Sequence, residues 1–269
     1  MMNTQVSADI QGLPHWSFNE DQVDTVGRYA LFRKYNDTQA EMVVLNVEDR
    51  RSLTRGGGAK RKNTQKSEMD AITLSKSKQR ARSKVRQLSM ALGVTHLMTL
   101  TQAENETSID VSLKSFKYFN KLMRKRWKNW AYVATPEYQS RGSVHFHLAV
   151  VGFYHANTVR KLWRRALKGK GGNVDMQAPK EFKNIRKPSP RQIAAYISKY
   201  ITKDETVGFN RKRYYSGGEF TPPQIFKGFS ARGLYIPKIA REIFNKLVKR
   251  HPAFMWESED EWGVYYFST

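Results

Sequence analysis

The sequence predicts an α+β fold, in which helices pack on an antiparallel sheet. Residues 130–138 and 143–152 have the composition of two strands, and the short polar turn between them, residues 139–142, makes them an antiparallel hairpin. Residues 111–129 repeat apolar side chains at helical spacing. Together these patterns predict a sheet built around a central hairpin, with helices packed against it.

The other elements follow from the same patterns of apolar residues. Residues 67–92 are predicted to form a helix that stops at Gly93, because a glycine after the last apolar position is typical of a helix end. From there the expected order is strand, helix, strand, strand, helix, strand, helix. The elements not yet named are strands at 28–34, 41–47, 96–101 and 173–177, and helices at 157–168, 190–203 and 237–249.

The start of the 190–203 helix is marked in the sequence. Ser189 can cap the helix, Pro190 suits its first position, and Gln192 lies three residues after the cap. This combination predicts that the helix begins at Pro190.

The length of 269 residues fits one domain of ordinary size with extensions. We expect an N-terminal extension over residues 1–66, a central domain over 67–208 and a C-terminal extension over 209–269. Residues 50–66 hold seven basic residues, no acidic residue and three consecutive glycines. We interpret this segment as a linker that also contacts phosphate, with a merely solvated loop as the alternative.

The charge of the chain favours a polyanionic partner. Forty-seven Lys and Arg against 24 Asp and Glu give a net charge of +23 and a sequence pI near 10.1. Basic proteins bind nucleic acid partly because phosphate contacts release condensed counterions. Charge alone would equally suit a protein bound to ribosomes or to acidic lipid.

Composition also excludes several classes of site. The chain has no cysteine, which excludes disulfides, cysteine-ligated zinc and thiol chemistry. No apolar run is long enough for a membrane span, and residues 1–19 lack the basic start and apolar core of a signal peptide. We therefore expect a cytoplasmic protein with no membrane partner.

A candidate metal site lies on the central hairpin. His145 and His147 alternate with apolar residues, so both imidazoles lie on one face of the strand, which we expect to look outward. Glu137 lies across the turn, near His145. Two histidines and a carboxylate would suit a divalent cation such as Mg or Mn. His96 is a rival ligand, and a purely structural role for the histidines is the alternative.

A candidate pair of nucleophiles lies on the 190–203 helix. Tyr196 and Tyr200 are four residues apart and share one helix face, with Lys199 and Lys203 further round. Because a phenol has a pKa of about 10, it needs a metal and a cation to attack phosphorus at neutral pH. Both hydroxyls can reach one phosphate, and we favour Tyr200 as the initiating nucleophile. The alternative is that both tyrosines are packing residues between helix and sheet.

Basic residues are dense around these tyrosines. Residues 160–203 contain thirteen Lys and Arg against two acids. Trp163, Tyr214 and Tyr215 are candidates for stacking on bases, although Trp163 has the position of a core residue. The side chains that we expect to contact DNA are Arg160, Lys161, Arg164, Arg165, Lys168 and Arg191.

These motifs together resemble the HUH endonucleases, and among them the two-tyrosine rolling-circle replication initiators of phages and plasmids. The resemblance rests on three segments in the family's order: an apolar strand ending in threonine at 97–101, the His145-Phe146-His147 motif, and the two-tyrosine helix with its lysines at 196–203. It covers roughly half of the chain, from about Ala81 to Lys203. The resemblance implies an antiparallel HUH or RRM-like palm with the central domain as the endonuclease.

The resemblance also implies an activity. Such a protein would be a metal-dependent endonuclease that nicks single-stranded origin DNA at a specific site, forms a 5′-phosphotyrosine and later rejoins the strand. Its partners would include a host helicase and the replication machinery of a bacterial cytoplasm. Rival hypotheses are an HUH transposase or relaxase, and a basic nucleic-acid-binding protein without catalysis.

Overall fold

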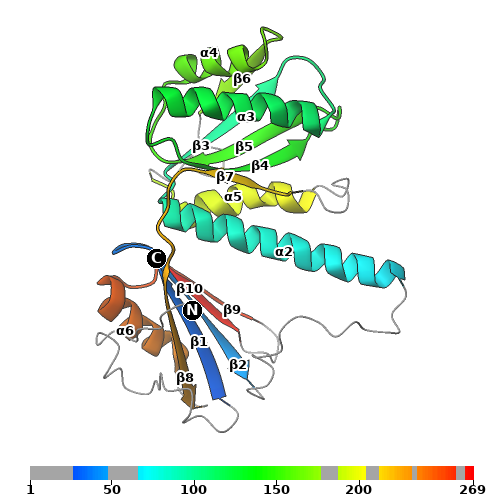
Figure 1. The fold of residues 1–269 in the computed structure, drawn as a ribbon. Helices are drawn as coiled ribbons and strands as arrows, with labels where there is room; N and C mark the ends of the chain where they lie inside the picture. The colour runs from blue at the N-terminus through cyan, green and yellow to red at the C-terminus, as the bar shows by residue number, and fades with distance from the viewer. Residues whose placement is uncertain (1–26, 48–65, 177–186, 204–211, 232–234, 259–263) are drawn as a thin grey trace, which may run out of the picture. The chain divides into compact units, whose positions relative to one another are not determined.

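The computed structural model describes residues 27–47, 66–176, 187–203, 212–231, 235–258 and 264–269 (Figure 1). The basic segment at 50–65 lies outside these residues. The chain forms two compact units, one of residues 65–220 and one that joins residues 1–64 to residues 221–269. Within the described part of the chain, no helix is both long and apolar enough to cross a membrane.

The unit of residues 65–220 is built on a five-stranded antiparallel sheet with the strand order β6-β3-β5-β4-β7. The predicted hairpin is β4 and β5, and it occupies the middle of the sheet (Figure 1). The strands are β3 (His96–Gln102), β4 (Tyr132–Tyr138), β5 (Val144–Val150), β6 (Gly172–Asp175) and β7 (Tyr215–Gly217).

Helices cover both faces of this sheet. The helices α3 (Ile109–Arg126) and α4 (Ala156–Ala166) lie on one face, and α2 (Lys66–Leu92) and α5 (Pro190–Lys203) lie on the other (Figure 1). The α+β class and the antiparallel sheet predicted from the sequence are confirmed, and the arrangement is compatible with an HUH or RRM-like fold.

The two faces of β5 enter two different cores. Phe146 and Leu148 pack with α3 and α4, whereas Ala149 packs with α2 and α5. Every residue of β5 is buried, and His145 and His147 are 6% and 7% exposed. The expectation that the histidines look outward is therefore wrong, because two helices cover their face of the sheet.

The start of α5 agrees with the capping pattern in its sequence. The Gln192 backbone N–H donates to Ser189 Oγ at 3.3 Å, and the Ser189 N–H donates to Gln192 Oε1 at 2.8 Å. These reciprocal bonds satisfy two N–H groups that a helix terminus would otherwise leave unpaired. They fix the first turn of the helix that carries the tyrosines.

The other unit is a second five-stranded antiparallel sheet with the order β8-β1-β2-β10-β9 and one helix, α6 (Ile236–Val248). The expected N- and C-terminal extensions share this sheet, because β1 pairs with β8 and β2 pairs with β10. Its core joins Phe32 and Met42 to Phe244 of α6 and Phe267 of β10. The strands are β1 (Gly27–Lys34), β2 (Ala40–Val47), β8 (Gln224–Ala231), β9 (Phe254–Glu257) and β10 (Tyr265–Ser268).

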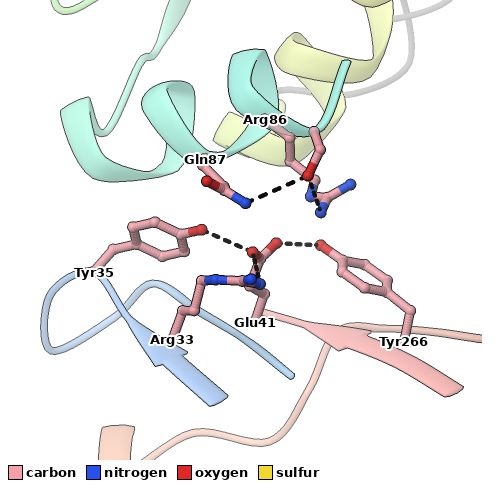
Figure 2. A network of polar contacts seen from close by, with 7 residues as sticks. Arg33, Tyr35, Glu41, Arg86, Gln87 and Tyr266 are labelled. Carbon is pink, nitrogen blue, oxygen red and sulfur yellow. Dashed lines mark hydrogen bonds and ion pairs between the residues drawn. The ribbon is translucent and has the colours of Figure 1, made fainter. Parts of the chain in front are cut away.

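A buried carboxylate ties three segments of this unit together. Glu41 Oε1 accepts hydrogen bonds from Arg33 Nη1 and from the Tyr35 hydroxyl, each at 2.9 Å. Glu41 Oε2 accepts a bond from the Tyr266 hydroxyl at 3.1 Å, as Figure 2 shows. A carboxylate taken out of water is tolerated only with partners of this kind, so Glu41 fixes β10 against the β1–β2 hairpin.

We expect Glu41→Gln to lower the free energy of unfolding by about 3 kcal/mol, because it removes one partner of a buried ion pair. The control is Asp37→Asn, which breaks the Lys34–Asp37 pair, where the Asp37 side chain is 94% exposed. That change should cost less than about 0.5 kcal/mol. Urea denaturation measures both, and equal losses would contradict the role assigned to Glu41.

Candidate active site

The candidate site lies where β3, β4 and β5 face α5. His147 of β5 has Thr99 of β3 as its cross-strand neighbour on one side and Thr135 of β4 on the other. His145 lies directly across from Glu137. Because paired residues of neighbouring strands share a face, the strand register brings all five side chains to the α5 side of the sheet.

His147 is held by three elements at once. Its Nε2 lies 2.6 Å from Glu137 Oε2, and its Nδ1 lies 3.3 Å from Thr99 Oγ1. The Tyr200 ring stacks on the imidazole, with ring centres 3.7 Å apart and planes 2° apart. The imidazole therefore joins one of the predicted nucleophiles to the predicted carboxylate.

His145 has a different environment. Its Nε2 is buried and has no hydrogen-bond partner. Burial, followed by the charges of His147 and Arg141, lowers the pKa of His145 to about 4, although Glu137 acts in the opposite direction. The imidazole is therefore neutral near pH 7, which is the form that binds a metal ion.

The chemistry of these residues fits a divalent cation only in part. A neutral histidine with a free nitrogen and a carboxylate beside a second histidine are suitable donors. Among the residues that the structure describes, however, no group of three or more His, Cys, Asp or Glu side chains is arranged to hold a metal ion. Metal ligation by His145, His147 and Glu137 therefore stays a prediction.

The two tyrosines contact each other. The Tyr200 hydroxyl donates to the Tyr196 hydroxyl at 3.1 Å, and the Tyr200 side chain is buried while that of Tyr196 is half-buried. Lys199 Nζ lies 4.1 Å from the centre of the Tyr196 ring. Lys203 is the last residue of α5, and its side chain lies outside the described part.

Two threonines position this site, and the sequence analysis did not give either a role of its own. Thr99 contacts His147, and the buried Thr135 hydroxyl donates to the backbone oxygen of Ile197 at 3.0 Å, which ties α5 to β4. Thr135 lies among apolar residues on β4. A polar residue in a buried strand is the signal that could have identified it.

Most of the predicted DNA contacts lie on α4, on the opposite face of the sheet from α5. Arg160 donates to the Asn173 side chain and the Val174 backbone oxygen, and Arg164 donates to the Gly172 oxygen, so both hold β6. Arg191 alone among these candidates lies on the tyrosine helix. The exposed members on the α4 side that bond to no β6 group are Lys161, Arg165 and Lys168.

The remaining candidates have other surroundings. His96 alternates with Met98 and Leu100 along β3, which puts it on the opposite face from Thr99. Trp163 is fully buried in the core under α3 and α4. Tyr214 and Tyr215 pack against the two cores from the edge of the sheet.

We expect stability to depend on pH through His145. Its folded pKa of about 4 lies below the unfolded value of about 6.5, so the unfolded chain binds a proton first as the pH falls. The free energy of unfolding should therefore decrease between about pH 6.5 and pH 4. His145→Asn should flatten that decrease in urea denaturation with a chelator present. The exposed His251→Asn is the control, and an equal decrease in both variants would contradict the assignment.

Comparison with known proteins points to replication. A family model for replication-associated proteins of the ORF2 type matches residues 95–205. The matched span contains Thr99, Glu137, both hairpin histidines and all of α5. Comparison with curated proteins gives no match, and comparison with solved structures gives none. The family match supports a Rep-like, replication-associated protein that acts on DNA.

Proposed function

We propose that this protein initiates rolling-circle replication as a metal-dependent, site-specific single-strand DNA endonuclease and strand transferase. The observation that carries the proposal is the stack of Tyr200 on His147, together with the hydrogen bond from Tyr200 to Tyr196. A phenol next to an imidazole that contacts a carboxylate is suited to nucleophilic attack on phosphorus. The match to a replication-associated family favours DNA as the substrate.

The proposed reaction exchanges one phosphoester for another. A tyrosine oxygen attacks phosphorus and loses its proton to solvent, while the bond to the 3′-oxygen breaks and that oxygen takes up a proton. The products are a 5′-phosphotyrosine and a free 3′-hydroxyl, which can later attack the phosphotyrosine and restore the strand. His145, His147 and Glu137 would hold Mg²⁺ or Mn²⁺, whose chemistry when bound is to polarise the scissile phosphate.

The contacts of the two tyrosines favour Tyr196 as the first nucleophile, rather than Tyr200 as the sequence suggested. Tyr200 donates its hydroxyl hydrogen to Tyr196, and this donation stabilises a phenoxide on Tyr196. The Lys199 ammonium over the Tyr196 ring adds a positive charge beside that oxygen. Tyr200 is buried against His147 and would take the second attack after the helix or the DNA moves.

We expect His145→Ala and His147→Ala to abolish nicking of single-stranded oligonucleotides from the origin region in Mg²⁺ or Mn²⁺, because each removes a ligand of the proposed metal. DNA affinity should change little, since the basic surface is retained. Glu137→Ala should raise the metal concentration needed, and His96→Ala, on the other face of the sheet, is the control. Normal cleavage by the double histidine variant with metal chelated would contradict the site.

The order of attack has its own test. Tyr196→Phe should form almost no denaturation-resistant adduct, whereas Tyr200→Phe should form it about tenfold more slowly and fail at repeated circle release. Tyr214→Phe serves as the control, and peptide mapping of the adduct identifies the attacking residue. An adduct on Tyr200 would reverse the order, and DNA attached to neither tyrosine would favour the hypothesis of a binding protein without catalysis.

A further inference from the structure

A basic groove runs along the β7 edge of the sheet, beside α3. Its larger part, of about 690 Å³, is lined by Arg124, Lys128, Trp130 and Gly218, among others. A smaller part, of about 260 Å³, shares Arg124 and is lined by Lys117, Lys121 and Tyr132. The sequence analysis assigned no role to any of these residues.

The cations of this groove form a row. Lys117, Lys121, Arg124 and Lys128 are spaced by four, three and four residues, so they share one side of α3 and its end. At a rise of about 1.5 Å per residue, the row is ~16 Å long. All four side chains are exposed, and in the described part of the chain none is in an ion pair. Glu219 is the one acid in the lining.

Glycines let the edge strand form a close wall for the groove. A Cβ atom at Gly217 would lie 2.6 Å from Tyr132 Cε1 and 2.8 Å from Arg124 Nη2. Gly218 has φ +105°, and a Cβ there would lie 2.4 Å from the Ala131 Cβ. Any larger residue at these positions would displace the wall or the arginine, so the shape of the groove depends on both glycines.

The lining identifies the ligand as a phosphate backbone. The two rings in the lining, Trp130 and Tyr132, are 2% and 6% exposed, so neither is available to stack on an unpaired base. Stacking is what single-strand platforms add to their charges. A straight row of ~16 Å spans about five phosphates of a duplex strand, which are about 3.4 Å apart along the axis. Contacts of this kind position DNA without reading its sequence.

We propose that this groove binds the phosphate backbone of duplex DNA, at a site separate from the tyrosines. The helix α3 packs on the opposite face of the sheet from α5, so the groove would hold duplex that flanks the nicked strand. This use of the groove rests on the proposed function. The affinity for duplex itself requires no covalent chemistry.

The test compares two double variants of the full chain. Lys121→Ala with Arg124→Ala removes two groove cations, and Lys238→Ala with Arg241→Ala removes the same residue types at the same helical spacing from exposed positions of α6. Fluorescence anisotropy measures the binding of a duplex of arbitrary sequence, and of one of its strands alone, at several salt concentrations.

The groove variant should reduce the log–log salt slope for duplex by about 1.8, since each lost phosphate contact contributes about 0.9. The α6 variant should leave the duplex slope unchanged, and the single strand should lose less than the duplex in the groove variant. Equal slopes for the two variants, or a loss confined to the single strand, would overturn the proposal. Because this readout needs no cleavage, a protein that forms no adduct but shows the slope change would refute the proposed nicking and keep the groove.

Discussion

The alternation of side chains along β5 is the constraint on which the catalytic unit depends. Helices cover both faces of this strand, so each of its residues belongs to one of two cores. One set, which includes Phe146 and Leu148, is apolar throughout, while the other includes both histidines. A shift of the register by one residue would exchange the two sets, and it would bury the histidines among aromatic rings.

Burial on the α5 side gives the site its chemical character. It keeps His145 neutral, and it confines His147 between Glu137, Thr99 and the Tyr200 ring. The hydrogen bond from Thr135 to the backbone of α5 links the tyrosine helix to the same strands. The positions of the phenols are thus set by the packing of a helix on a sheet, which is more rigid than a loop.

The positive charge of the unit is divided between the two faces of the sheet. The cations of α4 partly hold β6 in place, those of α3 line a groove at the opposite edge, and Lys199 lies over a tyrosine ring. A protein that engages both a scissile strand and its flanking duplex requires separate surfaces of this kind. The net charge of +23 supplies them.

The sequence by itself determined the hairpin, the start of α5 and the residues of the site, because alternation, helix capping and helical spacing are local properties of the chain. Tertiary structure alone decided that α2 and α5 cover the histidine face, that Tyr200 stacks on His147, and that Gly217 lies against Arg124. It also decided that the two ends of the chain share one sheet, where Ala40 bonds to Thr269 across 229 positions. These contacts join segments far apart in the chain, and the packing that selects them leaves no periodic pattern in the sequence.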